Sequence, residues 1–225
     1  MSAVAPTMSA TKSGSAHAGL YKQLSPAERY IHETRDEALL ALLRRRGVAS
    51  LAGLRAIELG CGEGSFLRSL LHYGAQPELL TGLDLIGAKL QRAAGAAPGA
   101  RLLAADGATL PYKSGAFDIA FAFTFLSSVI DPAPRRRAAA EALRVLRDGG
   151  LLVVYDFWTN PLNSRVRAVS SEELRSLFRG ARVEIERVTL APPIVRALGG
   201  RPICHTLERL PFLRTHLLAA VTKEP

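Results

Sequence analysis

The sequence has few cysteines and no long apolar runs. Its two cysteines, Cys61 and Cys204, lack metal-ligand spacing, which argues against a zinc site and against a disulfide framework. No window approaches the ~18 uninterrupted apolar residues that a membrane span requires. The start of the chain also lacks a basic segment followed by an apolar core, so we expect no secretory signal. Together these absences predict a cytoplasmic protein without a membrane span.

Aromatic residues are also scarce, at 6% of the chain, although the net charge is +9. Such a charge suits nucleic acid or an acidic membrane surface. The basic residues, 24 arginines and 5 lysines, are mostly scattered, with runs only at 44–46 and 135–137. No aromatic residues alternate with these runs, as a platform for stacking bases would require. We interpret the runs as solvated helix ends and do not favour a nucleic-acid partner.

The apolar content is sufficient for one complete domain. The chain has 225 residues, of which 48% are hydrophobic, so a single α/β domain is expected, which we assign to residues 20–225. Residues 1–19 are rich in small and polar residues, which predicts a disordered tail. A capping box at 25–28 predicts a helix over 26–46. Residues 192–213 form an insertion rich in Pro, Leu and Arg. We expect a soluble lid there, with peripheral membrane contact as the alternative.

The rest of the chain is organised around residues 56–66. An apolar run that carries Glu58 breaks into glycines at alternate positions, Gly60, Gly62 and Gly64, and an apolar helical pattern follows at once. This order predicts a buried strand, a tight turn and a helix start. Glycines allow positive backbone dihedrals and let a ligand lie almost against the main chain. Units of this kind bind cofactors at the carboxyl ends of parallel strands.

The same turn discriminates between two cofactors. A dinucleotide fingerprint requires a third glycine where this chain has Ser65, and it places a pyrophosphate at the helix N-terminus. Glu63 in the turn would repel that pyrophosphate. S-adenosylmethionine (SAM) has no phosphate, and it carries a sulfonium and an ammonium that acids attract. The turn therefore favours SAM, and we interpret Cys61 within it as a small packing residue rather than a nucleophile.

Periodicity places the other elements along the chain. Strands are predicted within 78–85, 101–105, 114–122 and 151–155, at the edge of the sheet over 183–190, and at 216–221, with helices at 65–73, 87–94, 134–147 and 170–179. Gly149 and Gly150 are interpreted as a helix C-cap and a turn. Asp84 ends the second strand at the point where a ribose needs an acceptor for its hydroxyls. The alternative role of Asp84 is that of N-cap for the helix after it.

Four ordered motifs resemble one enzyme family. Residues 58–64 (Glu-Leu-Gly-Cys-Gly-Glu-Gly) resemble motif I of the class I SAM-dependent methyltransferases. Residues 110–118, 131–132 and 143–150 then resemble the ubiquinone/menaquinone-biosynthesis-type methyltransferase domain, so that the resemblance covers roughly residues 55–158. It implies an α/β fold, a Rossmann-like seven-stranded, mostly parallel sheet with helices on both faces and an antiparallel last strand beside the fifth.

The resemblance also implies which residues hold the cofactor. Asp84 would bind the ribose of SAM, Leu85 would lie against the adenine, and Asp106 would accept from the adenine amino group. The N-terminal helix would cover the cofactor, with Tyr21 or Tyr30 facing the pocket unless each is an ordinary core aromatic. The complete set expected to bind SAM is Glu58, Gly60, Cys61, Gly62, Gly64, Asp84, Leu85, Asp106, Gly107 and Phe123.

The acceptor side is less well defined by the sequence. Many relatives carry one or two histidines where this chain has Ser127 and Ser128, and a serine hydroxyl needs activation to act as a base. The acids and histidines near the strand ends are the candidates for a base that removes the acceptor proton. The three selected are Asp156, His205 and His216, with Asp131 as a further acid in such a position. Tyr155, Phe157 and Trp158 are expected either to form an aromatic wall for the acceptor or to belong to the core.

These features predict a SAM-dependent methyltransferase that requires no metal. The expected reaction is O-methylation of a small-molecule or saccharide hydroxyl in a bacterial biosynthetic pathway. One alternative is a non-catalytic SAM-binding or scaffold domain, and another is an NAD(P)-linked oxidoreductase on a similar sheet. Methylation of nucleic-acid bases is less favoured, because residues 123–126 lack the Asn/Asp-Pro-Pro-aromatic motif of amino-directed base methyltransferases.

Overall fold

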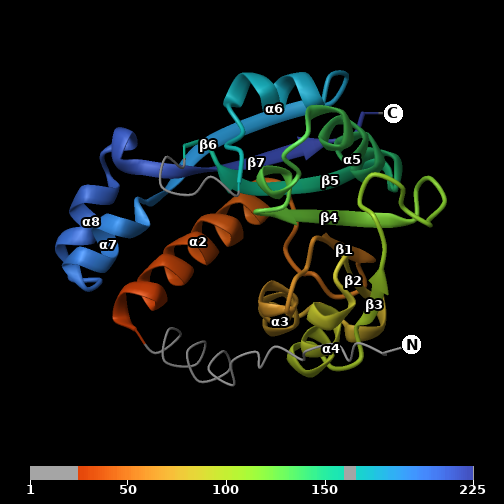
Figure 1. Cartoon of the computed structure of the whole chain (residues 1–225), viewed down its shortest axis with the longest axis horizontal. Coiled ribbons are helices and arrows are strands. Elements are labelled where there is room, and N and C mark those ends of the chain that lie inside the picture. Colours follow the sequence, from red (N-terminus) through yellow and green to blue (C-terminus); the bar gives the residue numbers. More distant parts are fainter. Residues whose placement is uncertain (1–24, 160–165, 225) are drawn as a thin grey trace, which may run out of the picture.

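A seven-stranded sheet forms the centre of the protein (Figure 1). The computed structural model describes residues 25–159 and 166–224, so the predicted tail over 1–19 and Tyr21 lie outside the described residues. The strand order is β3-β2-β1-β4-β5-β7-β6. The strands are β1 (Ala56–Leu59), β2 (Leu80–Asp84), β3 (Arg101–Ala104), β4 (Phe117–Phe123), β5 (Leu146–Phe157), β6 (Arg182–Leu190) and β7 (Arg214–Thr222).

Strand direction confirms the predicted topology. β1 pairs in parallel with β2 and β4, β3 extends the parallel sheet beyond β2, and β5 does so beyond β4. β7 is inserted antiparallel between β5 and β6, with Val154 opposite Ala219 in its register with β5. β6 is therefore the edge strand, as its alternating polar pattern predicted.

Helices cover both faces of the sheet, so the central strands β1, β2 and β4 are buried on both faces. One core joins α2, α3 and α4 to strand residues such as Ile119, Phe121 and Phe123. The other joins α5 and α6 to the alternate residues Ala120 and Ala122 of the same strand. The helices are α2 (Pro26–Arg45), α3 (Ser65–His72), α4 (Gly87–Ala96), α5 (Pro132–Arg144), α6 (Ser171–Leu177), α7 (Pro192–Leu198) and α8 (Ile203–Glu208), with short 3₁₀ turns η1 (Pro77–Leu79), η2 (Leu126–Ser128) and η3 (Pro211–Leu213).

Two local predictions about helix ends are wrong. Ser25 begins α2, but its side chain makes no capping bond. The Glu28 carboxylate instead accepts from Arg196 Nε of α7 at 2.7 Å, so a distant ion pair replaces the capping box.

The second error concerns the predicted helix C-cap at Gly149, because α5 ends at Arg144 and β5 already begins at residue 146. Gly149 (φ 71°) lies where β5 shifts register against β4, and the positive φ serves this irregularity rather than a helix cap.

The insertion over 192–213 folds as α7, α8 and η3 at one end of the sheet, beside the first half of α2 (Figure 1). A small separate core joins it to the start of α2, with Tyr30, Val195 and Cys204 among its members. The Tyr30 hydroxyl donates to Glu208 at 2.6 Å and its ring meets His205 edge-on. Tyr30 is thus a core aromatic. None of the described helices combines the length and the apolar character needed to traverse a bilayer.

Candidate cofactor and active site

A cavity of about 900 Å³ lies at the carboxyl ends of the parallel strands. The turn after β1, the end of β2, the segment after β3 and the end of β4 all contribute to its wall. All but one of the residues predicted to hold the cofactor line this single space. They are Glu58, Gly60, Cys61, Gly62, Asp84, Leu85, Asp106, Gly107 and Phe123.

The three glycines of the turn serve different purposes. Gly60 (φ 70°) lies so close to the Phe125 ring that an added Cβ would stand 2.7 Å from Cδ2. Gly62 (φ 55°) has nothing within 4 Å of its Cβ direction and therefore borders open space in the cavity wall. Gly64 (φ 78°) is outside the lining, and it begins α3 where a Cβ would lie 2.9 Å from Ala93 Cα. Gly64 therefore allows close approach of α3 and α4.

Asp84 joins the glycine turn to the end of β2. Its Oδ2 accepts from the backbone N–H of Gly62 at 3.0 Å, and its Oδ1 accepts from that of Ile86 at 2.9 Å. The side chain is buried but lines the cavity. The alternative role as helix N-cap is not observed, because α4 is capped at Ile86 without a side-chain bond. Each carboxylate oxygen retains a lone pair for a ligand hydroxyl.

Asp106 and Gly107 form the opposite wall of the cavity. Asp106 Oδ1 accepts from the N–H of Ala108 at 2.8 Å, which holds the turn after β3. A Cβ on Gly107 would lie 2.5 Å from Phe125 Cζ. Because Phe125 also touches Gly60, its ring spans the distance between the two ligand-facing turns. The sequence interpretation missed Phe125, although its position just beyond β4 was a signal.

Glu58 is a buried carboxylate at the floor of the cavity. It is 3% exposed, and its Oε2 has no hydrogen-bond partner among the described residues. Burial raises its pKa to about 8, against the opposing effect of the Arg35 charge. A buried carboxyl oxygen without a partner needs either a proton or a cation. The floor of the cavity therefore suits a positively charged group.

Arg35 of α2 is the cationic side chain that the sequence interpretation missed. Its guanidinium lies over the rings of Phe66 and Phe123, at 5.6 and 5.9 Å, and it lines the cavity. Asp36 accepts from Arg35 Nε at 2.7 Å and from the hydroxyl of Tyr73 at 2.6 Å, so two elements fix the carboxylate that orients Arg35. The available signal was helical spacing, because Arg35 is on the same face as the buried Leu39 and Leu42.

The three residues predicted as bases are dispersed, and none lines the cavity. Asp156 is buried and accepts from the backbone N–H groups of Ser127 and Phe157, both at 2.9 Å, so that it fixes η2 to β5; burial raises its pKa to about 6. His216 is stacked on Tyr155 at 4.7 Å, and burial lowers its pKa to about 3. His205 lies exposed on α8 against Tyr30.

The remaining wall of the cavity is aromatic with a few polar groups. Of the predicted aromatic wall, Tyr155 lines the cavity, whereas Phe157 and Trp158 do not. Trp158 Nε1 donates to the carbonyl of Arg214 at 2.6 Å, which explains an indole in a polar loop. Asp131, at the N-terminus of α5, lines the cavity, and its carboxylate has no hydrogen bond within the described part of the chain.

Cys61 behaves as a packing residue. Its side chain is buried beside Gly82, where an added Cβ would lie 3.0 Å from Sγ. Burial raises the pKa of its thiol to about 12, so the nucleophilic thiolate is absent at neutral pH. No group of three or more His, Cys, Asp or Glu residues with metal-binding geometry occurs among the described residues.

Comparison with known proteins identifies this arrangement. The family model described as "Methyltransferase domain" matches residues 57–154, which contain the glycine turn, Asp84, Asp106 and β4. The protein carries a class I SAM-dependent methyltransferase domain. Its cofactor, the methyl donor, is SAM.

The similar proteins of known sequence differ in what their names say they modify. This chain is 31% identical over 155 residues to 27-O-demethylrifamycin SV methyltransferase of Amycolatopsis mediterranei, covering 65% of this chain and 55% of the relative. It is 30% identical over 130 residues to demethylmenaquinone methyltransferase of Clavibacter sepedonicus, covering 56% and 51%. A yeast tRNA (carboxymethyluridine(34)-5-O)-methyltransferase is 27% identical over 140 residues, covering 60% and 46%. The chain spans about half the length of these curated relatives.

Solved structures agree with the fold alone. A SAM-dependent methyltransferase from Thermotoga maritima, described as a possible histamine N-methyltransferase, has a TM-score of 0.62 at 21% identity, covering 92% of this chain and 96% of that one. The [4+2]-cyclase SpnF has a TM-score of 0.60 at 22% identity, covering 83% and 80%. Proteins of different stated chemistry thus share this architecture, so the residues of the cavity must carry any functional argument.

Proposed function

We propose that this methyltransferase transfers the methyl group of SAM to a hydroxyl oxygen of a small-molecule or saccharide acceptor in a bacterial biosynthetic pathway. One observation carries this proposal. The same cavity contains the polar groups suited to SAM and, beside them, an aromatic wall with the carboxylate of Asp131. The relatives named for rifamycin and menaquinone precursors support a small-molecule acceptor.

The chain's own residues offer complementary groups for each part of the donor. We assign Asp84 to the ribose hydroxyls and Asp106 to the adenine amino group. Glu58 lacks a partner at Oε2 and is suited to the ammonium of the methionyl part. Arg35, held by Asp36, is suited to its carboxylate. When bound, SAM supplies a methyl group on a sulfonium, which is already an activated leaving group.

The protein's task is then to position the acceptor, exclude water and take up one proton. Transfer forms the O–methyl bond, breaks the S–methyl bond, and releases the hydroxyl proton. We assign that proton to Asp131, because it lines the cavity and its carboxylate makes no bond to the described residues. Asp156, His205 and His216, the bases expected from the sequence, contribute nothing to the lining.

The test is transfer of labelled methyl from SAM to matched acceptors. Hydroquinones, polyketide hydroxyls and free sugars would be compared with amines of the same carbon skeleton, and the methylated atom located by NMR. We expect methylation of oxygen alone, and a kcat for Asp131→Asn reduced about 100-fold with unchanged affinity for S-adenosylhomocysteine (SAH).

Three results would contradict the proposal. Methylation of nitrogen or carbon only would refute the assigned reaction while leaving the enzyme class intact. Binding of SAH without transfer to any acceptor, transfer RNA included, would favour the scaffold alternative. Methylation of transfer RNA in place of small molecules would refute the small-molecule acceptor and favour the kind of acceptor named for the yeast relative.

A further inference from the structure

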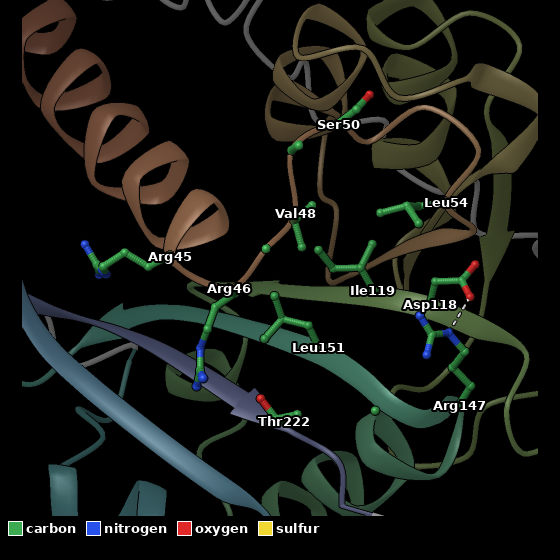
Figure 2. A pocket seen from close by; sticks show the side chains of 13 residues that line it. Arg45, Arg46, Val48, Ser50, Leu54, Asp118, Ile119, Arg147, Leu151 and Thr222 are labelled. Atoms are coloured by element: carbon green, nitrogen blue, oxygen red, sulfur yellow. Dashed lines mark hydrogen bonds and ion pairs between the residues drawn. The ribbon is translucent and has the colours of Figure 1, made fainter.

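A second cavity, of about 460 Å³, lies at the opposite end of the sheet (Figure 2). Its wall consists of the segment after α2, the first residues of β4, the first half of β5 and the end of β7, where Thr222 lies. The SAM cavity is at the carboxyl ends of the parallel strands, whereas this one is at the amino end of β4. The two cavities have no lining residue in common.

The floor of this second cavity is apolar. Val48, Leu54, Ile119 and Leu151 lie together in its middle, and the last two are buried core residues (Figure 2). Arg46 stands on one side of this floor, and Arg147 stands on the other. An apolar floor flanked by guanidinium groups suits a ligand with an apolar body and acidic substituents.

Asp118, on the Arg147 side of the cavity, shares its carboxylate between two arginines. Asp118 accepts from Arg147 Nε at 2.8 Å and from Arg55 Nε at 3.1 Å. Burial acts against ionisation of this carboxyl, but its bonds to the two arginines lower its pKa to about 2, so its single charge is divided between two cations. One positive charge is therefore left in excess on this side of the cavity.

The Arg46 side shows the same excess. Glu184 of β6 is shared by Arg46, at 3.3 Å, and Arg182, at 3.0 Å, while Glu186 pairs with Arg45. The Nε and Nη2 atoms of Arg46 are buried and have no acceptor among the described residues. Buried polar groups without partners are rare in native proteins, because each loses its hydration without replacement. Arg46 therefore needs an acceptor.

We propose that this second cavity binds a small organic oxyanion, a phosphate or carboxylate attached to an apolar body. In this site Arg46 and Arg147 bind the oxygen atoms, and Ile119 and Leu151 pack against the body. The proposal is independent of the acceptor and of the methyl-transfer reaction.

Calorimetric titration tests the site with two probes that separate the two oxyanion sources, phenyl phosphate and benzoate. Saturating SAH fills the donor side of the first cavity, and binding that depends on both Arg46 and Arg147 reports on the second cavity, because neither arginine lines the first. We expect at least one probe to bind wild type, with affinity reduced about tenfold or more in Arg46→Gln and in Arg147→Gln. Arg175→Gln on the exposed face of α6 removes the same charge elsewhere and is expected to bind like wild type.

A second measurement follows the Arg46 guanidinium directly in the wild-type protein. The Nε–H signal of Arg46 in ¹⁵N-labelled protein, assigned by its absence in Arg46→Gln, is expected to shift on titration of the probe that binds. Equal affinities in all variants, competition with SAH, or an Arg46 signal that never moves would each overturn the proposal. The last result would mean that water alone satisfies the guanidinium.

Discussion

Binding of SAH to the free protein should release close to one proton at pH 7, and Glu58 should be its source. Burial raises the pKa of this carboxyl to about 8, and its Oε2 lacks a partner within the described chain. With that pKa about 90% of Glu58 is protonated at pH 7. An ammonium placed beside it favours the charged form and lowers the pKa. Binding and deprotonation are therefore coupled.

The size of the coupling follows from the same pKa. While Glu58 is protonated in the free protein and ionised in the complex, the association constant rises about tenfold per pH unit, or ~1.4 kcal/mol. The rise ends near pH 8, the pKa of the free protein. In the free protein the same raised pKa makes stability fall as pH rises from 4.5 to about 8, because the native state holds a proton that the unfolded chain releases.

Calorimetric titration with SAH in two buffers of different ionisation enthalpy measures the number of protons released. Glu58→Gln keeps the shape of the protonated side chain and should abolish both the release and the slope of affinity against pH. Asp131→Asn removes another carboxylate of the cavity wall and should leave both unchanged. Undiminished proton release by Glu58→Gln would refute the assignment of the ammonium to this carboxyl.

Three further predictions address the cofactor turn and the core. Asp84→Ala should weaken SAH binding about tenfold or more, ~1.4 kcal/mol, in calorimetry, while NADH fails to bind wild type. Gly60→Ala should destabilise the protein in urea by about 1–3 kcal/mol more than Gly62→Ala, because only its Cβ meets Phe125; Phe125→Ala should remove that difference. Since burial lowers the pKa of His216 to about 3, its native form stays neutral while the unfolded state gains a proton below pH 6.5. His216→Phe should therefore unfold at lower pH in an acid titration, and equal midpoints would contradict this.

The order of elements was readable because each carries a local pattern. The run into Gly60, Gly62 and Gly64 predicted β1, its turn and α3 within a residue, and the alternation over 183–190 identified the edge strand β6. The errors at Ser25 and Gly149 have one cause. In both cases a contact between distant segments outweighs a local preference for a helix cap, which is worth about 1 kcal/mol. At Ser25 this contact is an ion pair, and at Gly149 it is strand pairing.

Nine of the ten residues that the sequence predicted to hold the cofactor line one cavity, and Gly64 is the exception. Most of these residues lie on turns directly after β1, β2 and β3, and the parallel sheet brings these turns to one edge. The candidate bases for the acceptor side do not line this cavity, because Asp156 and His216 were selected only for their position at strand ends. Position on a strand does not state which way a side chain points, and both are buried away from the cavity.

The sequence by itself determined the family, the sheet and the glycine turn after β1, because short-range spacing encodes all three. Only the tertiary structure decided which distant side chains meet. It brought Arg35 of α2 over Phe66 and Phe123 at the donor cavity, and it placed Arg46 and Arg147 on either side of one apolar floor. These contacts join segments up to about a hundred residues apart. Tertiary packing fixes them, and no local sequence pattern records it.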